Sequence, residues 1–133
     1  GLIFLLLMLQ LSQTIKGDLL LNRLDSRVTA RVWIEKNIPQ GSKIAAEAYS
    51  PWIEPANYTF KPIFFLIFYP PSWYLEQGFD YLVFSEGAFG RFYQEPEKYK
   101  KTIAAYEQFF QEFNLIKEFT NGDYQIRIYR VNN

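Results

Sequence analysis

The chain has 133 residues, which suits a single domain because one hydrophobic core commonly serves about 100 to 150 residues. Its 14 basic and 14 acidic side chains cancel, so it lacks the excess positive charge on which nucleic-acid binders rely, and we exclude DNA and RNA as partners. It contains no Cys and no His, which excludes thiol nucleophiles, disulfides, Cys/His zinc sites and imidazole-based triads, and leaves carboxylate, Lys, Tyr or Ser chemistry or a hard cation held by carboxylates.

The chain opens with an apolar run. No charged residue precedes Lys16, and residues 1–11 are almost entirely aliphatic or aromatic. The run is shorter than the ~20 residues that span a bilayer, and it begins with Gly rather than Met. We therefore expect residues 1–17 to be the end of a transmembrane helix and residues 18–133 to be a soluble domain. The run lacks the basic leading region and the small-residue cleavage site of a signal peptide, so a buried core helix is the remaining alternative.

An amphipathic helix and a first strand are predicted next. The apolar stripe of the helix consists of Leu21, Leu24, Val28 and Val32, widened by Ala30, Trp33 and Ile34. These positions recur at three- and four-residue steps, which is typical of a helix with one buried face. The helix should end near Asn37, because Pro39 disfavours helical backbone at Ile38. After a turn at residues 40–42, residues 43–48 are predicted to form a strand.

Residues 49–71 contain five prolines, which cannot sit inside a central strand ladder because each lacks an amide donor. We expect most of this segment to be loop. Within it, residues 63–69 form a continuous apolar run of strand length, which predicts a core strand covered on both faces. Contact with lipid is the alternative. The aromatic residues Trp52, Tyr58, Trp73 and Tyr74 in or beside this loop could stack on sugars, rest at a membrane interface or pack in the core.

The remaining elements complete an α/β fold. Residues 72–77 are predicted to form a short helical turn, and residues 79–84 a strand in the middle of the sheet. A long helix over residues 95–114 should lay an aromatic stripe on the sheet through Tyr99, Ile103, Tyr106, Phe110 and Phe113. Asn-Gly at residues 121–122 predicts an antiparallel hairpin between residues 115–119 and 124–131. The expected architecture is a mixed sheet of about four or five strands with flanking helices.

Polar side chains follow two of the predicted strands. Glu47 and Tyr49 come after the first strand, and Ser85, Glu86 and Arg91 come after the later one. Ligands of open α/β sheets collect outside the carboxyl ends of the strands, so these five residues are the candidate ligand-facing set. A carboxylate pair between Glu47 and Glu86 is one option, but nothing in the sequence predicts a raised pKa, and we expect solvated carboxylates.

Residues 85–91 also carry a glycine pattern. Gly87 and Gly90 would free backbone amides to bind an anion, with Arg91 as a bidentate clamp. The Lys and Ser/Thr of a nucleotide-binding loop are missing, so we favour a Gly-rich strand-to-helix turn with Arg91 in a surface ion pair. Lys98, Lys100 and Lys101 are interpreted as the solvated face of the following helix, with anionic lipid headgroups as the alternative contact.

Several segments resemble the C-terminal region of glycosyltransferase family 39, the group related to dolichyl-phosphate-mannose protein mannosyltransferases and lipid A aminoarabinose transferases. The resemblance covers most of the chain after Asp25 and rests on Asp25-Ser-Arg27, Ala30, Trp33-Ile34, Asn37-Ile-Pro39, Gly41-Ser-Lys-Ile44, Tyr49, Gly78-Phe-Asp-Tyr-Leu-Val83, Gly90-Arg-Phe92 and Ile126-Arg-Ile-Tyr-Arg130. It implies a polytopic membrane enzyme that passes a sugar from a polyprenyl-phosphate donor to a glycan or protein acceptor outside the cell membrane.

In that family the acidic base and metal ligand lie in loops between early transmembrane helices. The resemblance therefore implies no catalytic residue, no metal ligand and no cofactor in this chain, and a divalent metal would belong to the membrane part. The chain itself would scaffold the enzyme or dock the acceptor on the extracytoplasmic side. Basic residues after the apolar run would favour the cytoplasmic side, although large domains translocate largely regardless of charge. A membrane-tethered, non-enzymatic binding or sensing module is the alternative function.

Overall fold

The computed structural model describes residues 25–120 and 122–132. In chain order the elements are α2 (Ser26–Asn37), β1 (Lys43–Ala46), β2 (Thr59–Pro62), the 3₁₀ helix η1 (Leu66–Phe68), α3 (Pro71–Glu76), β3 (Tyr81–Ser85), α4 (Glu86–Gln94), α5 (Lys100–Glu112), β4 (Asn114–Phe119) and β5 (Ile126–Arg130). None of the helices in these ranges has the length and apolar character needed to cross a bilayer. The predicted end of a transmembrane helix at residues 1–17 lies outside the described residues.

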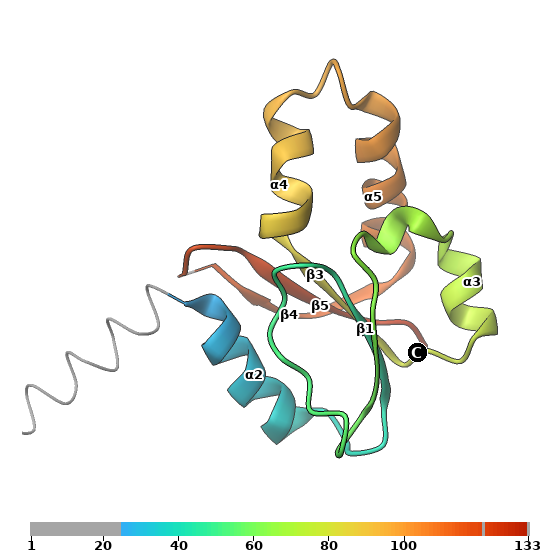
Figure 1. Ribbon diagram of the computed structural model, residues 1–133. Coiled ribbons are helices and arrows are strands. Elements are labelled where there is room, and N and C mark those ends of the chain that lie inside the picture. The colour runs from blue at the N-terminus through green and yellow to red at the C-terminus, as the bar shows by residue number, and fades with distance from the viewer. Residues whose placement is uncertain (1–24, 121, 133) are drawn as a thin grey trace, which may run out of the picture.

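A five-stranded mixed sheet organises the domain (Figure 1). Its strand order is β2-β1-β3-β5-β4, with β1 parallel to both β2 and β3. The other pairs, β3 with β5 and β5 with β4, are antiparallel. The predicted α/β class, the mixed sheet, the central position of β3 and the closing antiparallel pair are all confirmed.

Both faces of the sheet are covered, because successive side chains of a strand point to opposite faces. Ile44, Val83 and Ile128 pack with α2 and the loop after β1. Leu82 and Phe84 pack on the other face with η1, α3, α4 and α5. Figure 1 shows α2 on one side of the sheet and α4 and α5 on the other. The central strands are therefore apolar on both sides, as their sequences predicted.

Helix α2 buries a different face from the one predicted. Asp25 caps it by accepting a hydrogen bond from the Arg27 amide at 3.0 Å. Ala30 and Ile34 are buried as expected, but Val28 and Val32 are 50% and 45% exposed. The sheet contacts the row at positions 26, 30 and 34, which lies about half a turn away from Val28 and Val32. Residues 21–24 lie outside the described range.

The core strand predicted at residues 63–69 is wrong. The strand in this region is the edge strand β2, which ends at Pro62, and the chain then turns into η1. The turn is fixed at Leu66, whose N–H donates to the Glu47 carboxyl group at 3.0 Å and whose carbonyl accepts from the Tyr74 hydroxyl at 2.6 Å. Ile63 and Leu66 are buried, whereas Phe64 and Phe68 are 58% and 64% exposed.

The second half contains a helix that the sequence did not predict. Residues 85–91 were expected to form a Gly-rich strand-to-helix turn, but residues 86–94 form α4. Helix α5 is shorter than the predicted helix at residues 95–114. Within α5 the stripe is confirmed at Tyr106, which is buried, but Phe109 is also buried and was not predicted. Strands β4 and β5 confirm the hairpin, whose Asn121 lies outside the described residues.

Candidate functional site

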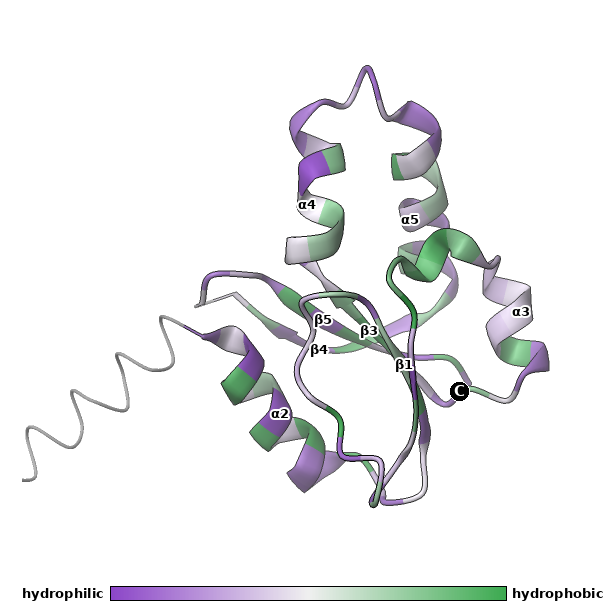
Figure 2. Ribbon diagram, in the orientation of Figure 1, coloured by the Kyte–Doolittle hydropathy of each residue, from purple (hydrophilic) through white to green (hydrophobic). Residues whose placement is uncertain are grey.

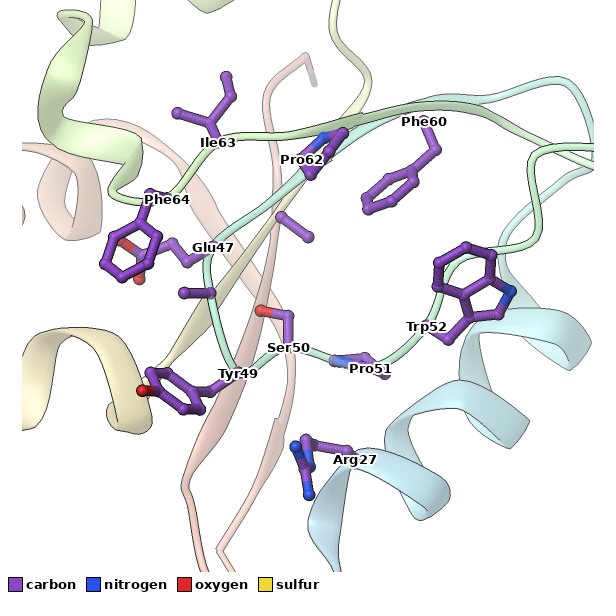
Figure 3. Close-up of a pocket in the computed structure, with 12 residues that line it drawn as sticks. Arg27, Glu47, Tyr49, Ser50, Pro51, Trp52, Phe60, Pro62, Ile63 and Phe64 are labelled. Carbon is purple, nitrogen blue, oxygen red and sulfur yellow. The ribbon is translucent and has the colours of Figure 1, made fainter.

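The parallel strands β1, β2 and β3 lead to one edge of the sheet, and a hollow of about 530 Å³ opens there. Figure 3 shows it between the loop after β1, the end of β2 and the start of α2. Its side chains include Arg27, Tyr49, Ser50, Trp52, Phe60 and Phe64. Ligand-binding crevices lie at this position in open α/β sheets, so the expectation of a site beyond the strand ends agrees with the geometry.

Aromatic side chains form much of the wall of the hollow. Trp52 is exposed and meets the ring of Phe60 edge-on at 6.4 Å between centroids. Tyr49 is also exposed, and its ring lies against that of Tyr124 at 5.7 Å. Exposed rings of this kind offer flat faces that can stack on the apolar face of a ligand.

Tyr49 has an uncommon backbone conformation. Its φ angle is 65°, in the left-handed region that bulky residues rarely adopt. The Ser85 hydroxyl donates to the Tyr49 carbonyl at 2.9 Å and holds the chain in this conformation. Strained backbone clusters at ligand sites, and here it turns the chain so that Tyr49, Ser50 and Trp52 all line the hollow.

Two polar groups lie among the aromatic rings. The Ser50 hydroxyl is buried and has no hydrogen-bond partner within the part of the chain that the structure describes. Arg27 reaches the rim from the first turn of α2, where its Nε lies 3.2 Å from an Asp25 carboxylate oxygen (Figure 3). A hydroxyl group left without a partner is costly when buried, so Ser50 is a group that a bound ligand could satisfy.

Glu47 is not the solvated carboxylate that we expected. Its side chain is 4% exposed, and its carboxyl group receives hydrogen bonds from the Leu66 amide at 3.0 Å, the Ser85 amide at 3.3 Å and the Tyr106 hydroxyl at 2.7 Å. Burial raises the pKa of Glu47 to about 8, against the opposing effect of these three hydrogen bonds.

The surroundings of Glu47 give it a structural role. Figure 3 shows the side chain turned away from Arg27 and Trp52, toward Phe64. Its hydrogen bonds join the end of β1 to η1, β3 and α5. Burial also raises the pKa of Tyr106, and the neighbouring Glu47 raises it further, so this tyrosine stays a neutral donor. Glu47 is therefore positioned to hold the elements that frame the hollow rather than to exchange protons with a ligand.

Ser85 and Glu86 begin α4. The Ser85 side chain caps the helix by accepting from the Gly87 amide at 3.2 Å, and the Glu86 amide donates to the Gln125 carbonyl at 2.8 Å. The Gly87 amide, one of the two considered from the sequence as anion donors, therefore already has a partner. Gly87 instead permits close packing, because a Cβ there would lie 2.7 Å from Cβ of Tyr49. Glu86 is exposed and does not pair with Glu47, whose carboxyl group is directed into the core.

Arg91 lies over aromatic rings rather than in the predicted ion pair. Its guanidinium is 5.4 Å from the ring centre of Phe65 and 4.8 Å from that of Phe92. With Tyr49 and Phe64 it lines a small hollow of about 130 Å³. With Glu86 it also lines a groove of about 700 Å³ on the other side of α4.

The candidate residues therefore divide into two groups. Glu47, Tyr49 and Ser85 are brought together by direct hydrogen bonds, whereas Glu86 and Arg91 lie along α4. Sequence reasoning missed Arg27, Ser50 and Phe60. Their position at the hollow depends on how α2, the loop and β2 pack, although the aromatic residues of the loop, Trp52 among them, gave a local signal. Within residues 25–120 and 122–132, no group of three or more acidic side chains is placed to hold a metal ion.

Comparisons of the chain with protein-family models, with curated proteins and with solved structures find no match. The chemistry of the site is therefore the guide to function. The hollow offers aromatic faces, a hydroxyl group and a guanidinium, while the nearby carboxyl group of Glu47 is turned into the core. These groups can stack on a ligand and form hydrogen bonds with it.

Proposed function

We propose that this chain is the C-terminal extracytoplasmic domain of a polytopic membrane glycosyltransferase, and that its hollow docks the acceptor. The enzyme would transfer a sugar from a polyprenyl-phosphate donor to a glycan or protein. The family resemblance of the segments after Asp25 suggests this activity, and the hollow supports the docking role.

The observation that carries the docking role is the pairing of aromatic walls with an unpartnered hydroxyl group. Trp52 and Tyr49 can stack on the apolar faces of sugar rings, and Ser50 can exchange a hydrogen bond with a sugar hydroxyl. Arg27 adds one positive charge at the rim, suited to a polar or anionic group of the acceptor. The bond-making groups would lie in the membrane part of the enzyme.

Attachment to a membrane segment completes the proposal. Arg27 in the first turn of α2 lines the hollow. A transmembrane helix ending in residues 1–17 would precede α2 in the chain. It would hold the hollow near the membrane surface, where a lipid-linked donor presents its sugar.

The test uses the complete protein that contains this chain. Trp52→Ala should raise KM for the acceptor about tenfold, a loss of about 1.4 kcal/mol of binding, while kcat changes little. Leu115→Ala is the matched control, because Leu115 is exposed on β4 and does not line the hollow. Thermal unfolding of both variants checks that the fold is unchanged.

Two results would contradict the proposal. If KM and kcat of the Trp52 variant equal those of the Leu115 control, the hollow does not dock the acceptor. If the complete protein transfers no sugar from any polyprenyl-phosphate donor, the alternative of a membrane-tethered binding or sensing module gains support.

A further inference from the structure

A second surface feature lies next to the hollow. Phe64, Phe68 and Tyr69 are exposed aromatic residues at and beside η1, and we call these three residues the aromatic ridge. The half-buried Phe65 joins two of them, with ring centres 4.7 Å from Phe64 and 5.5 Å from Phe68. In Figure 2 the segment around η1 is coloured as strongly hydrophobic. An exposed apolar patch of this kind marks an interaction site.

Several backbone groups beneath the ridge have hydrogen-bond partners. The Phe64 carbonyl accepts from the Ala48 amide at 3.2 Å, and the Phe65 carbonyl accepts from the Phe68 amide at 3.0 Å. Leu66 uses both its amide and its carbonyl in bonds to Glu47 and Tyr74. A segment that enters a low-dielectric environment needs such internal bonds, because unpaired backbone groups are costly there.

Two positively charged side chains lie beside the ridge. Lys61 is the one charged residue in the sequence of residues 58–75. Its Nζ lies 5.8 Å from the ring centre of Trp73, which in turn stacks on Tyr69 at 3.9 Å. The guanidinium of Arg91 lies 5.4 Å from the ring centre of Phe65. Aromatic side chains flanked by Lys and Arg, without nearby acid in the same segment, suit the headgroup region of an anionic bilayer.

One end of the ridge borders the hollow. Phe64 lines the same hollow as Arg27, which belongs to the first turn of α2. A membrane helix before α2 would hold the domain at the bilayer, where the ridge could reach lipid. This step rests on the membrane attachment in the proposed function.

We propose that the aromatic ridge inserts into the headgroup region of a bilayer that contains anionic lipid, with Lys61 and Arg91 beside the lipid phosphates. The domain would then rest on the membrane in one orientation. The hollow would open along the membrane surface, next to the ridge, where an acceptor could meet a lipid-linked sugar.

The chain contains no Cys, which permits a single spin label to be placed at any chosen position. Phe68→Cys and, as the matched control, Leu115→Cys would each be labelled in the full chain and reconstituted in vesicles of phosphatidylethanolamine and phosphatidylglycerol. Both positions are exposed, so the substitutions leave the core intact. Collision with oxygen, which concentrates in the bilayer, is compared with collision with a water-soluble nickel complex. The oxygen-to-nickel ratio should be severalfold higher at position 68 than at position 115.

Equal ratios at the two positions would overturn the proposal. A label at position 68 shielded from both reagents would also overturn it, because a protein surface rather than lipid would then cover the ridge. This experiment and the test of enzymatic function have distinguishable outcomes. If the ridge contacts lipid but the protein transfers no sugar, the ridge proposal holds for a membrane-tethered module. If the chain does not associate with vesicles, the proposed membrane attachment is wrong as well.

Discussion

Glu47 shows how a single residue connects the core to the site. Its carboxyl group contacts η1, β3 and α5, and it directly follows β1. The Leu66 amide that it binds fixes the turn from which Phe64 and Phe68 project. The sequence identified Glu47 as a candidate residue by its place after a strand. It could not show that the carboxyl group is buried, because η1 and α5 supply its partners from distant positions.

The raised pKa of Glu47 predicts a pH dependence of stability. In the unfolded chain its ordinary pKa is 4.5, whereas burial raises it to about 8 in the folded domain. The folded state therefore holds this proton more tightly, and the contribution of Glu47 to stability is greatest below pH 4.5 and falls as the pH rises to about 8. The loss approaches about 1.4 kcal/mol per pH unit within this interval.

Glu47→Gln, a neutral isostere, should remove this contribution. Urea unfolding of the two proteins between pH 5 and pH 8 would measure it, because the difference between their free energies of unfolding isolates the contribution of residue 47. The free energy of the wild type should fall relative to that of the variant by about 1 kcal/mol for each pH unit. A difference that stays constant with pH would show that Glu47 ionises with an ordinary pKa.

At the level of elements, local patterns predicted which segments are helices and strands better than which faces they bury. Helix α2 was expected, but its exposed face was misassigned at Val28 and Val32. The apolar run at residues 63–69 has strand-like composition, yet among residues 25–120 and 122–132 the sheet ends at β2, and the run forms the 3₁₀ helix η1 instead. Both errors have the same cause. The sequence pattern shows which residues are apolar, but tertiary packing decides which of them are buried.

The cap of α2 gives a prediction for this element. Asp25 accepts a hydrogen bond from the Arg27 amide, so Asp25→Ala should lower the free energy of unfolding by about 1 kcal/mol. Asp25→Asn keeps an oxygen acceptor at the same position and should cost much less. Denaturant unfolding of the two variants checks this. Equal losses would indicate that the exposed ion pair with the Arg27 side chain, rather than the cap, is the source of the stability.

For the whole molecule, the two-sided core predicts independent folding. The sheet is covered on both faces by apolar clusters built from residues after position 25. We expect residues 21–133, expressed alone, to fold with cooperative unfolding and to show no sugar transfer from a polyprenyl-phosphate donor. Circular dichroism and a radiolabelled transfer assay provide the measurements. Turnover by this fragment would mean that the catalytic groups lie in the chain itself.

Composition and short-range periodicity were sufficient to predict the α/β class, the central strands and the closing antiparallel pair, and to exclude thiol and imidazole chemistry. They could not show that Ser50 and Trp52 meet Arg27 at one hollow, that the Glu47 carboxyl group is buried, or that Phe64 and Phe68 are exposed. Each of these features depends on the packing of segments far apart in the chain, and burial and pKa are properties of that packing rather than of the residue type.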